Sequence, residues 1–195
     1  MTQRNLNRIK FVAMAVLFFA PMVLAAVLYY GPDSWKPHSY TAEGTLLNPA
    51  RPLPQVDFRL ADGESASLDT LWTILHVQNE SCQDDCQYRL WQTRQMRTLL
   101  HRRRGRVQRA VLVSQPAEAP ELAAALAEGH PRLKVLALNA ADRAVFNDWL
   151  GSLPVENPVL LIDPLGNFLM YYGDELPLEG MHKDIKRLLK LSNIG

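Results

Sequence analysis

The sequence predicts one α/β domain, built as a mixed sheet with helices on both faces and preceded by a single N-terminal transmembrane helix. Three observations predict this fold. Residues 11–30 carry no charge, strand-like and helical patterns alternate after them, and the last two strand-like runs flank a tight turn. Alternation indicates parallel strands joined by helices, and the final hairpin makes the sheet mixed.

The N-terminal segment is expected to anchor the chain in a membrane. Residues 1–10 are basic, with no acidic residue before Asp33, so the positive-inside bias places them in the cytoplasm as a short tail. Residues 11–30 then form the anchor, and the rest of the chain lies on the opposite side. In a bacterium this is a single-pass inner-membrane protein with its C-terminal domain in the periplasm. A cleaved signal peptide is the alternative, because residues 23–25 offer a small-residue cleavage pattern. The apolar run continues to Tyr29 and Tyr30, which favours a retained anchor.

The remainder of the chain has the length of one ordinary domain. Residues 31–52 are proline-rich with little periodicity and are predicted to be a linker, which leaves residues 53–195 as the folded domain. The predicted strands are residues 71–77, 107–113, 133–138, 158–162 and 168–172, and the turn before the last strand is residues 163–167. The predicted helices follow residue 82 and cover residues 118–128, 142–150 and 181–191.

A basic cluster, His101–Arg106, separates the first predicted helix of the domain from the next strand. One interpretation is a solvated helix end, where cations complement the helix dipole and Gly105 forms a left-handed cap. The other is a docking patch for anionic lipid or an acidic partner. The overall charge is nearly balanced, with 21 Lys and Arg against 20 Asp and Glu, so no nucleic-acid partner is expected.

Cys82 and Cys86 are the only cysteines, and they lie where the strand over residues 71–77 gives way to a helical pattern. Residues four apart on one helical turn have Cβ atoms about 5–6 Å apart, close enough to form a disulfide or to bind one soft metal ion such as Cu(I). Export to an oxidising compartment favours a disulfide, and two cysteines are too few for a disulfide framework. A structural role, in which the pair only stabilises a loop, is the alternative.

The sequence around this pair resembles the Sco-type proteins, thioredoxin-like proteins that help to assemble the copper centre of cytochrome c oxidase. Residues 56–63 resemble that family's lead-in hairpin, and residues 162–168 its late strand-turn-strand. Cys82 and Cys86, with Asp84 between them, are similar to its Cys-x-x-x-Cys motif. The resemblance implies a thioredoxin-like fold and Cu(I) held by both cysteines. It also implies a partner that is a cytochrome oxidase subunit or another copper or thiol assembly protein.

Two positions depart from the Sco pattern. Gln83 stands where a proline is usual, and residues 153–158 contain no histidine where the family's third copper ligand lies. Asn157 occupies the nearest position and is a poor ligand for a soft ion, so the sequence leaves copper as an uncertain cofactor. Asn157 and Pro158 instead resemble the segment where thioredoxin-type oxidoreductases place a cis-proline facing their cysteines, which would favour thiol exchange.

The leading hypothesis is therefore a protein that assists cytochrome c oxidase assembly, by thiol-disulfide exchange on partner cysteines or by copper delivery. Cys82 would be the attacking sulfur, because helix N-terminal amides stabilise a thiolate, although Asp84 and Asp85 oppose this. Cys86 would resolve the mixed disulfide. The second hypothesis is a non-catalytic scaffold with a structural disulfide, so enzyme status stays open. A thiol peroxidase is a weaker option, because Asn79 occupies the position where that chemistry would place a threonine.

Overall fold

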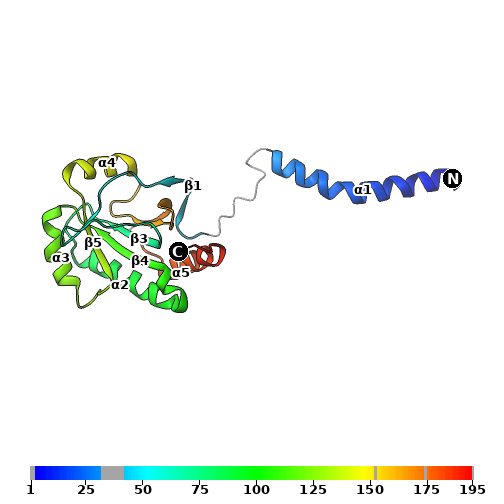
Figure 1. The fold of residues 1–195 in the computed structure, drawn as a ribbon. Helices are drawn as coiled ribbons and strands as arrows, with labels where there is room; N and C mark the ends of the chain where they lie inside the picture. The colour runs from blue at the N-terminus through cyan, green and yellow to red at the C-terminus, as the bar shows by residue number, and fades with distance from the viewer. Residues whose placement is uncertain (1–2, 32–41, 152, 174, 195) are drawn as a thin grey trace. The chain divides into compact units, whose positions relative to one another are not determined.

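The computed structural model describes residues 3–31, 42–151, 153–173 and 175–194. It divides into two units, residues 1–41 and residues 42–195. The first unit contains one helix, α1 (Gln3–Tyr30), and the second contains the sheet with its covering helices (Figure 1).

Helix α1 is long and apolar enough to cross a membrane. The qualifying stretch, Asn7–Tyr30, has 24 residues, and an 18-residue window within it has a mean hydropathy of 2.7. Pro21 lies inside the helix without ending it. The apolar helix predicted over residues 11–30 is therefore present; a signal sequence would meet the same criteria of length and composition.

The second unit is built on a seven-stranded mixed sheet in the order β1-β7-β6-β3-β4-β5-β2. β3 pairs in parallel with β4, and β4 with β5, whereas every other neighbouring pair is antiparallel. The strands are β1 (Thr45–Pro52), β2 (Arg59–Leu60), β3 (Trp72–Val77), β4 (Val107–Leu112), β5 (Leu133–Ala137), β6 (Val159–Ile162) and β7 (Asn167–Tyr172). The sheet is therefore mixed, as predicted.

Four helices cover this sheet, and three of them lie on one face. The helices are α2 (Asp84–Leu99), α3 (Ala119–Leu126), α4 (Ala140–Leu150) and α5 (Leu178–Leu191). A short 3-10 helix, η2 (His101–Arg106), follows α2, and another, η3 (Pro116–Glu118), precedes α3. Figure 1 shows α4 on the opposite side of the sheet from α2 and α5. Because both faces are covered, all six residues of the central strand β3 are buried.

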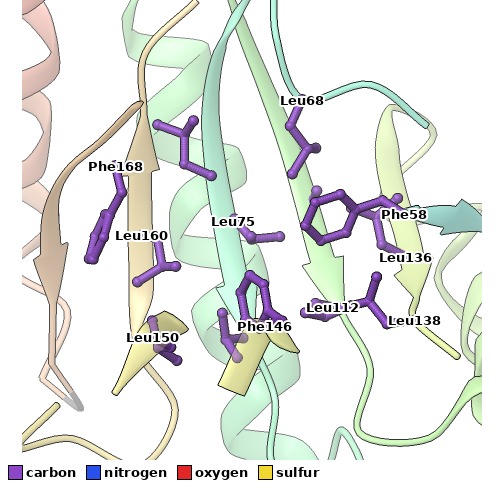
Figure 2. Packing of buried hydrophobic residues seen from close by; sticks show 13 residues of the cluster. Phe58, Leu68, Leu75, Leu112, Leu136, Leu138, Phe146, Leu150, Leu160 and Phe168 are labelled. Carbon is purple, nitrogen blue, oxygen red and sulfur yellow. The ribbon is translucent and has the colours of Figure 1, made fainter. Parts of the chain in front are cut away.

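The core beneath α4 contains side chains from five neighbouring strands. Phe146 and Leu150 of α4 pack with Leu75 of β3, Leu112 of β4 and Leu160 of β6 (Figure 2). On the other face, α2 and α5 form one buried cluster with β3 and β6, and the first turns of α2 form another with α3, β4 and β5. The side chains alternate between the two faces along each strand, as a sheet covered on both sides requires.

The folded unit begins earlier than the sequence indicated. Residues 45–52, predicted to be part of a linker, form β1, which pairs with β7 at the edge of the sheet. The backbone N–H groups of Glu43 and Gly44 each donate to a carboxylate oxygen of Asp184 in α5, at 3.0 Å. The domain therefore starts at Ala42 rather than at residue 53. Residues 32–41 of the predicted linker lie outside the described residues.

The end of α2 also differs from the prediction. Gly105 does not have the positive φ of a left-handed cap; the left-handed residue is His101, with φ of 48°. The helix ends at Leu99 and the chain continues into η2, in which Arg106 donates to the carbonyl oxygens of Leu189, Ser192 and Ile194. Arg106 thus caps carbonyl groups at the C-terminal end of α5, whereas the other residues of the basic cluster are exposed to solvent.

Candidate functional site at the start of helix α2

Cys82 and Cys86 form a disulfide where β3 passes into α2, with their Cα atoms 5.2 Å apart. Gln83 is the N-cap of α2, so Cys86 lies in the first turn whereas Cys82 lies just before the helix. The predicted strand-to-helix placement is correct, but the two residues do not share a helical turn. They are still close enough to pair, because Cα separations of about 4.4–6.8 Å suit a disulfide.

The two sulfurs differ in their surroundings. Cys86 is 6% exposed and packs in the apolar cluster that α2 forms with α3. Cys82 is half-buried and lines a hollow of about 250 Å³. The other lining residues are Ser81, Gln87, Glu118, Glu121, Leu122 and Ala125. A partner thiol can therefore approach Cys82 through this hollow, while Cys86 is shielded.

Glu118 ties the loop before Cys82 to the neighbouring strand end. Its two carboxylate oxygens accept hydrogen bonds from the hydroxyls of Ser81, at 2.7 Å, and Ser114, at 2.9 Å. Because both oxygens have donors, the carboxylate holds the wall of the hollow in place. Sequence reasoning missed this residue, because no motif connects Glu118 to the cysteines.

The segment before β6 lies beside the end of β3. The carbonyl oxygen of Pro158 accepts from the backbone N–H of Val77, and the side-chain oxygen of Asn157 accepts from the N–H of Asn79. However, the one cis peptide bond among the described residues is Asn48-Pro49, so the Asn157-Pro158 bond is trans. The prediction of a cis-proline at Pro158 is wrong. Pro158 is also buried, and its carbonyl extends the pairing between β6 and β3 inside the sheet.

Arg89 fixes this segment from the buried face of α2. One guanidinium nitrogen donates to the carbonyl oxygen of Asn157, at 2.7 Å, and the other to that of Gly173, at 2.8 Å. Arg89 is 3% exposed. One helical turn after Cys86, it thus joins the disulfide helix to the loops before β6 and after β7. A charged residue among the apolar positions of a helix face was the one sequence signal for it.

Arg143 of α4 makes a similar clamp at the ends of the parallel strands. It donates to the carbonyl oxygens of Val113, at 2.7 Å, and Gln78, at 2.8 Å. Burial lowers the pKa of its guanidinium from the ordinary value. The loop from Gln78 to the disulfide therefore starts from a fixed point.

His76 is the histidine of β3, and it is a core residue. Its Nε2 lies 3.0 Å from the hydroxyl oxygen of Thr93 in α2, and the side chain is 1% exposed. Burial first, and then the charges of Arg109 and Arg89, hold its pKa well below the usual value. The ring is therefore neutral at physiological pH, and it packs in the core beneath α2.

A copper site at the disulfide would rest on two sulfurs. Among the described residues there is no group of three His, Cys, Asp or Glu side chains placed to hold a metal ion. The reduced sulfurs suit soft Cu(I), but Asn157, the residue nearest to the expected histidine position, is a poor ligand for it, and its side chain already bonds to Asn79. The residues present thus provide two ligands of the implied set and lack the third.

Comparison with known proteins identifies the family. A family described as "Transmembrane-like, thioredoxin-like, C-terminal domain" matches residues 72–192, which is more than half of the chain. The chain belongs to this family. No curated protein matches the sequence.

Solved structures with the same fold include Sco proteins. Apo Sco1 from Thermus thermophilus superposes with a TM-score of 0.61 at 19% identity, covering 78% of this chain and 99% of its own. Copper-bound ScoI from Arabidopsis thaliana has a TM-score of 0.57 at 16% identity, covering 73% and 99%. A thiol:disulfide interchange protein from Bacteroides has a TM-score of 0.55 at 12% identity, covering 72% and 90%. At such identities the likeness shows the fold, so the predicted thioredoxin-like architecture is confirmed.

Proposed function

We propose that this protein is a membrane-anchored thiol-disulfide exchange protein that acts on partner cysteines during cytochrome c oxidase assembly. The observation that carries the proposal is the asymmetry of the disulfide, in which Cys82 lines a hollow and Cys86 is buried. A sulfur that is accessible at a helix start is suited to attack, and a shielded one to resolution. The Sco-like fold supports the link to oxidase assembly.

In this proposal the reduced protein transfers two electrons to a partner disulfide. The Cys82 thiolate attacks one partner sulfur, forming a Cys82–partner bond and releasing the other partner sulfur as a thiolate that takes up a proton. The Cys86 thiolate then attacks the sulfur of Cys82, which releases the second partner thiol. The Cys82–Cys86 disulfide is regenerated as the partner is reduced.

The setting we propose is a bacterial inner membrane crossed once by α1, with residues 1–10 in the cytoplasm and the domain in the periplasm. The composition of α1 and its basic flank supports this orientation. An oxidising periplasm also accounts for a disulfide in a chain with only two cysteines.

A trapping experiment tests the exchange reaction. The purified chain is incubated with a peptide that contains an internal disulfide, using Cys86→Ser and Cys82→Ser as matched variants. We expect Cys86→Ser to accumulate a mixed disulfide through Cys82, because the resolving thiol is missing, whereas Cys82→Ser forms little. Equal trapping by both variants, or none by either, would contradict the proposed roles.

The scaffold hypothesis makes a different prediction in cells. If the protein is a non-catalytic scaffold, the Cys82→Ser variant should support oxidase activity as well as the wild type does. Charge reversal of the basic residues in the region Arg102–Arg106 should instead abolish that oxidase activity. Thiol exchange predicts the opposite order of effects. Oxidase activity and copper content measured in both strains separate the two hypotheses.

Copper delivery is the second candidate, favoured by the two adjacent sulfurs and by the copper-bound Sco structures of the same fold. Anaerobic Cu(I) titration of the reduced chain tests it, with X-ray absorption to count ligands. Stoichiometric Cu(I) with a third protein ligand would support delivery. A chain that only exchanges thiols would show a measurable redox potential and weak copper binding.

A further inference from the structure

A basic surface lies at the opposite end of α2 from the disulfide. Its cations line two adjoining hollows of about 330 and 870 Å³, which share Leu99, His101 and Arg102. The charged lining residues are Arg102, Arg103, Arg104, Arg132 and Lys186, joined by His101 and His182. We call these seven residues the basic surface. No carboxylate lines either hollow among the described residues.

This surface carries a charge that the rest of the domain does not share. Of the 21 Lys and Arg in the chain, three precede residue 31 and 18 follow it, against 20 Asp and Glu that all follow it. The portion after residue 30 therefore has a net charge of −2, while five cations are gathered in one place. On α5, Lys183, Arg187 and Lys190 are exposed as well.

Within the described part of the chain, no ion pair joins a cation of the basic surface to a carboxylate, so these cations repel one another. Among the described residues, the ion pair found is Arg59 with Asp57, far along the chain from the basic surface. Burial first, and then the charges of Arg132 and Arg104, lower the pKa of neighbouring Arg97. A crowded surface of one sign is complementary to an anionic surface, which would relieve this repulsion.

The chain between α1 and the domain limits where this surface can go. Eleven residues, 31–41, can span no more than about 40 Å even when fully extended. The chain enters the domain where the N–H groups of Glu43 and Gly44 bind Asp184 of α5, and α5 also contributes His182 and Lys186 to the basic surface. A membrane crossed by α1 is therefore always within reach of these cations.

We propose that the basic surface docks the domain onto anionic lipid headgroups of the membrane that α1 crosses. The inference rests on the anchoring proposed above and is independent of the thiol chemistry. Each Lys or Arg held near an anionic leaflet adds to the attraction, and tethering raises the effective concentration of the domain at the surface. Because α2 has 16 residues and is about 24 Å long, docking at its C-terminal end would hold the disulfide roughly that far from the headgroups.

Arginine footprinting of the full chain in lipid nanodiscs tests the proposal. Discs of phosphatidylcholine are compared with discs that also contain phosphatidylglycerol, and phenylglyoxal labelling rates are read by mass spectrometry. We expect labelling of Arg102, Arg103, Arg104 and Arg132 to slow by about fivefold or more in the anionic discs and to recover in high salt. Arg59, exposed and paired with Asp57, is the internal reference.

Two triple variants separate local charge from net charge. Replacing Arg102, Arg103 and Arg104 with Gln should abolish protection of Arg132. The matched control, Ala117→Glu with Ala124→Glu and Ala127→Glu, also lowers the net charge by three at exposed positions, and protection should persist. Loss of protection in both variants would overturn the assignment to this surface.

The remaining outcomes also decide the matter. Equal labelling in both disc types overturns docking. Protection in phosphatidylcholine discs on adding inorganic phosphate would identify a small-anion site, and protection by polyglutamate but not by phosphatidylglycerol would identify an acidic protein partner; either result overturns the lipid assignment. Co-elution of the chain with the discs in high salt reports the anchor separately. A chain that stays in the discs unprotected refutes docking alone, and one that fails to insert refutes the anchor.

Discussion

Reduction of the Cys82–Cys86 disulfide is expected to cost the domain little stability. The cross-linked residues are only four apart, and the loop-closure entropy for a ring of this size corresponds to about 2 kcal/mol, compared with about 3 kcal/mol for a 15-residue loop. For a domain of this size that predicts a fall in Tm of about 4–8 °C. Two of the three apolar clusters contain neither cysteine, and we expect them to retain the fold.

Thermal unfolding of the full chain, followed by circular dichroism with and without a phosphine reductant, measures this cost. The double variant Cys82→Ser/Cys86→Ser is the control. Its Tm should match that of the reduced wild type and should not change when the reductant is added. A fall in Tm beyond about 20 °C, or loss of cooperative unfolding, would mean that the bond is a structural brace. The scaffold hypothesis would then replace the exchange reaction.

Three further substitutions test the surroundings of the site. Arg89→Met removes two charge-assisted hydrogen bonds, so it should lower the free energy of unfolding, measured in urea, by about 2–4 kcal/mol. It should also speed amide hydrogen exchange in the loop around Asn157, and unchanged exchange there would argue against the clamp. Because burial depresses the pKa of His76, the unfolded state binds its proton first as the pH falls through about 6.5, so stability should be full above that pH and decline below it. His76→Gln should flatten this decline, and an unchanged pH profile in that variant would contradict the buried neutral ring. Phe146→Ala should cost about 3–5 kcal/mol in denaturant, and a cost under 1 kcal/mol would contradict the packing in Figure 2.

The central part of the fold could be predicted because local pattern and burial agree there. β3, β4 and β6 are short runs rich in apolar residues, and all of their residues except Gln108 are buried. β1 could not be predicted in the same way. Its sequence contains two prolines and its residues are mostly exposed, so it is a strand only because β7 offers an edge to pair with.

The same distinction holds at the site. The cysteines could be placed at a helix start because the strand before them is unmistakable. The isomer of the Asn157-Pro158 bond could not be predicted, because the packing around an X-Pro bond decides whether it is cis or trans. Here the bond is trans, and hydrogen bonds from Val77 to the Pro158 carbonyl and from Arg89 to the Asn157 carbonyl hold the segment. The role of Arg89 depends on contacts with Asn157 and Gly173, which lie 68 and 84 residues away in the chain.

The two proposed activities compete for the same sulfurs. A disulfide has no thiolate to offer a metal, and two thiolates that hold Cu(I) cannot attack a partner. A third ligand would let copper binding oppose oxidation, but the described residues supply none beside Cys82 and Cys86. Copper occupancy in this chain should therefore follow the reduced fraction of the pair. Reduction of a partner disulfide also needs the reduced pair, but it needs no third ligand, and that difference favours exchange as the primary activity.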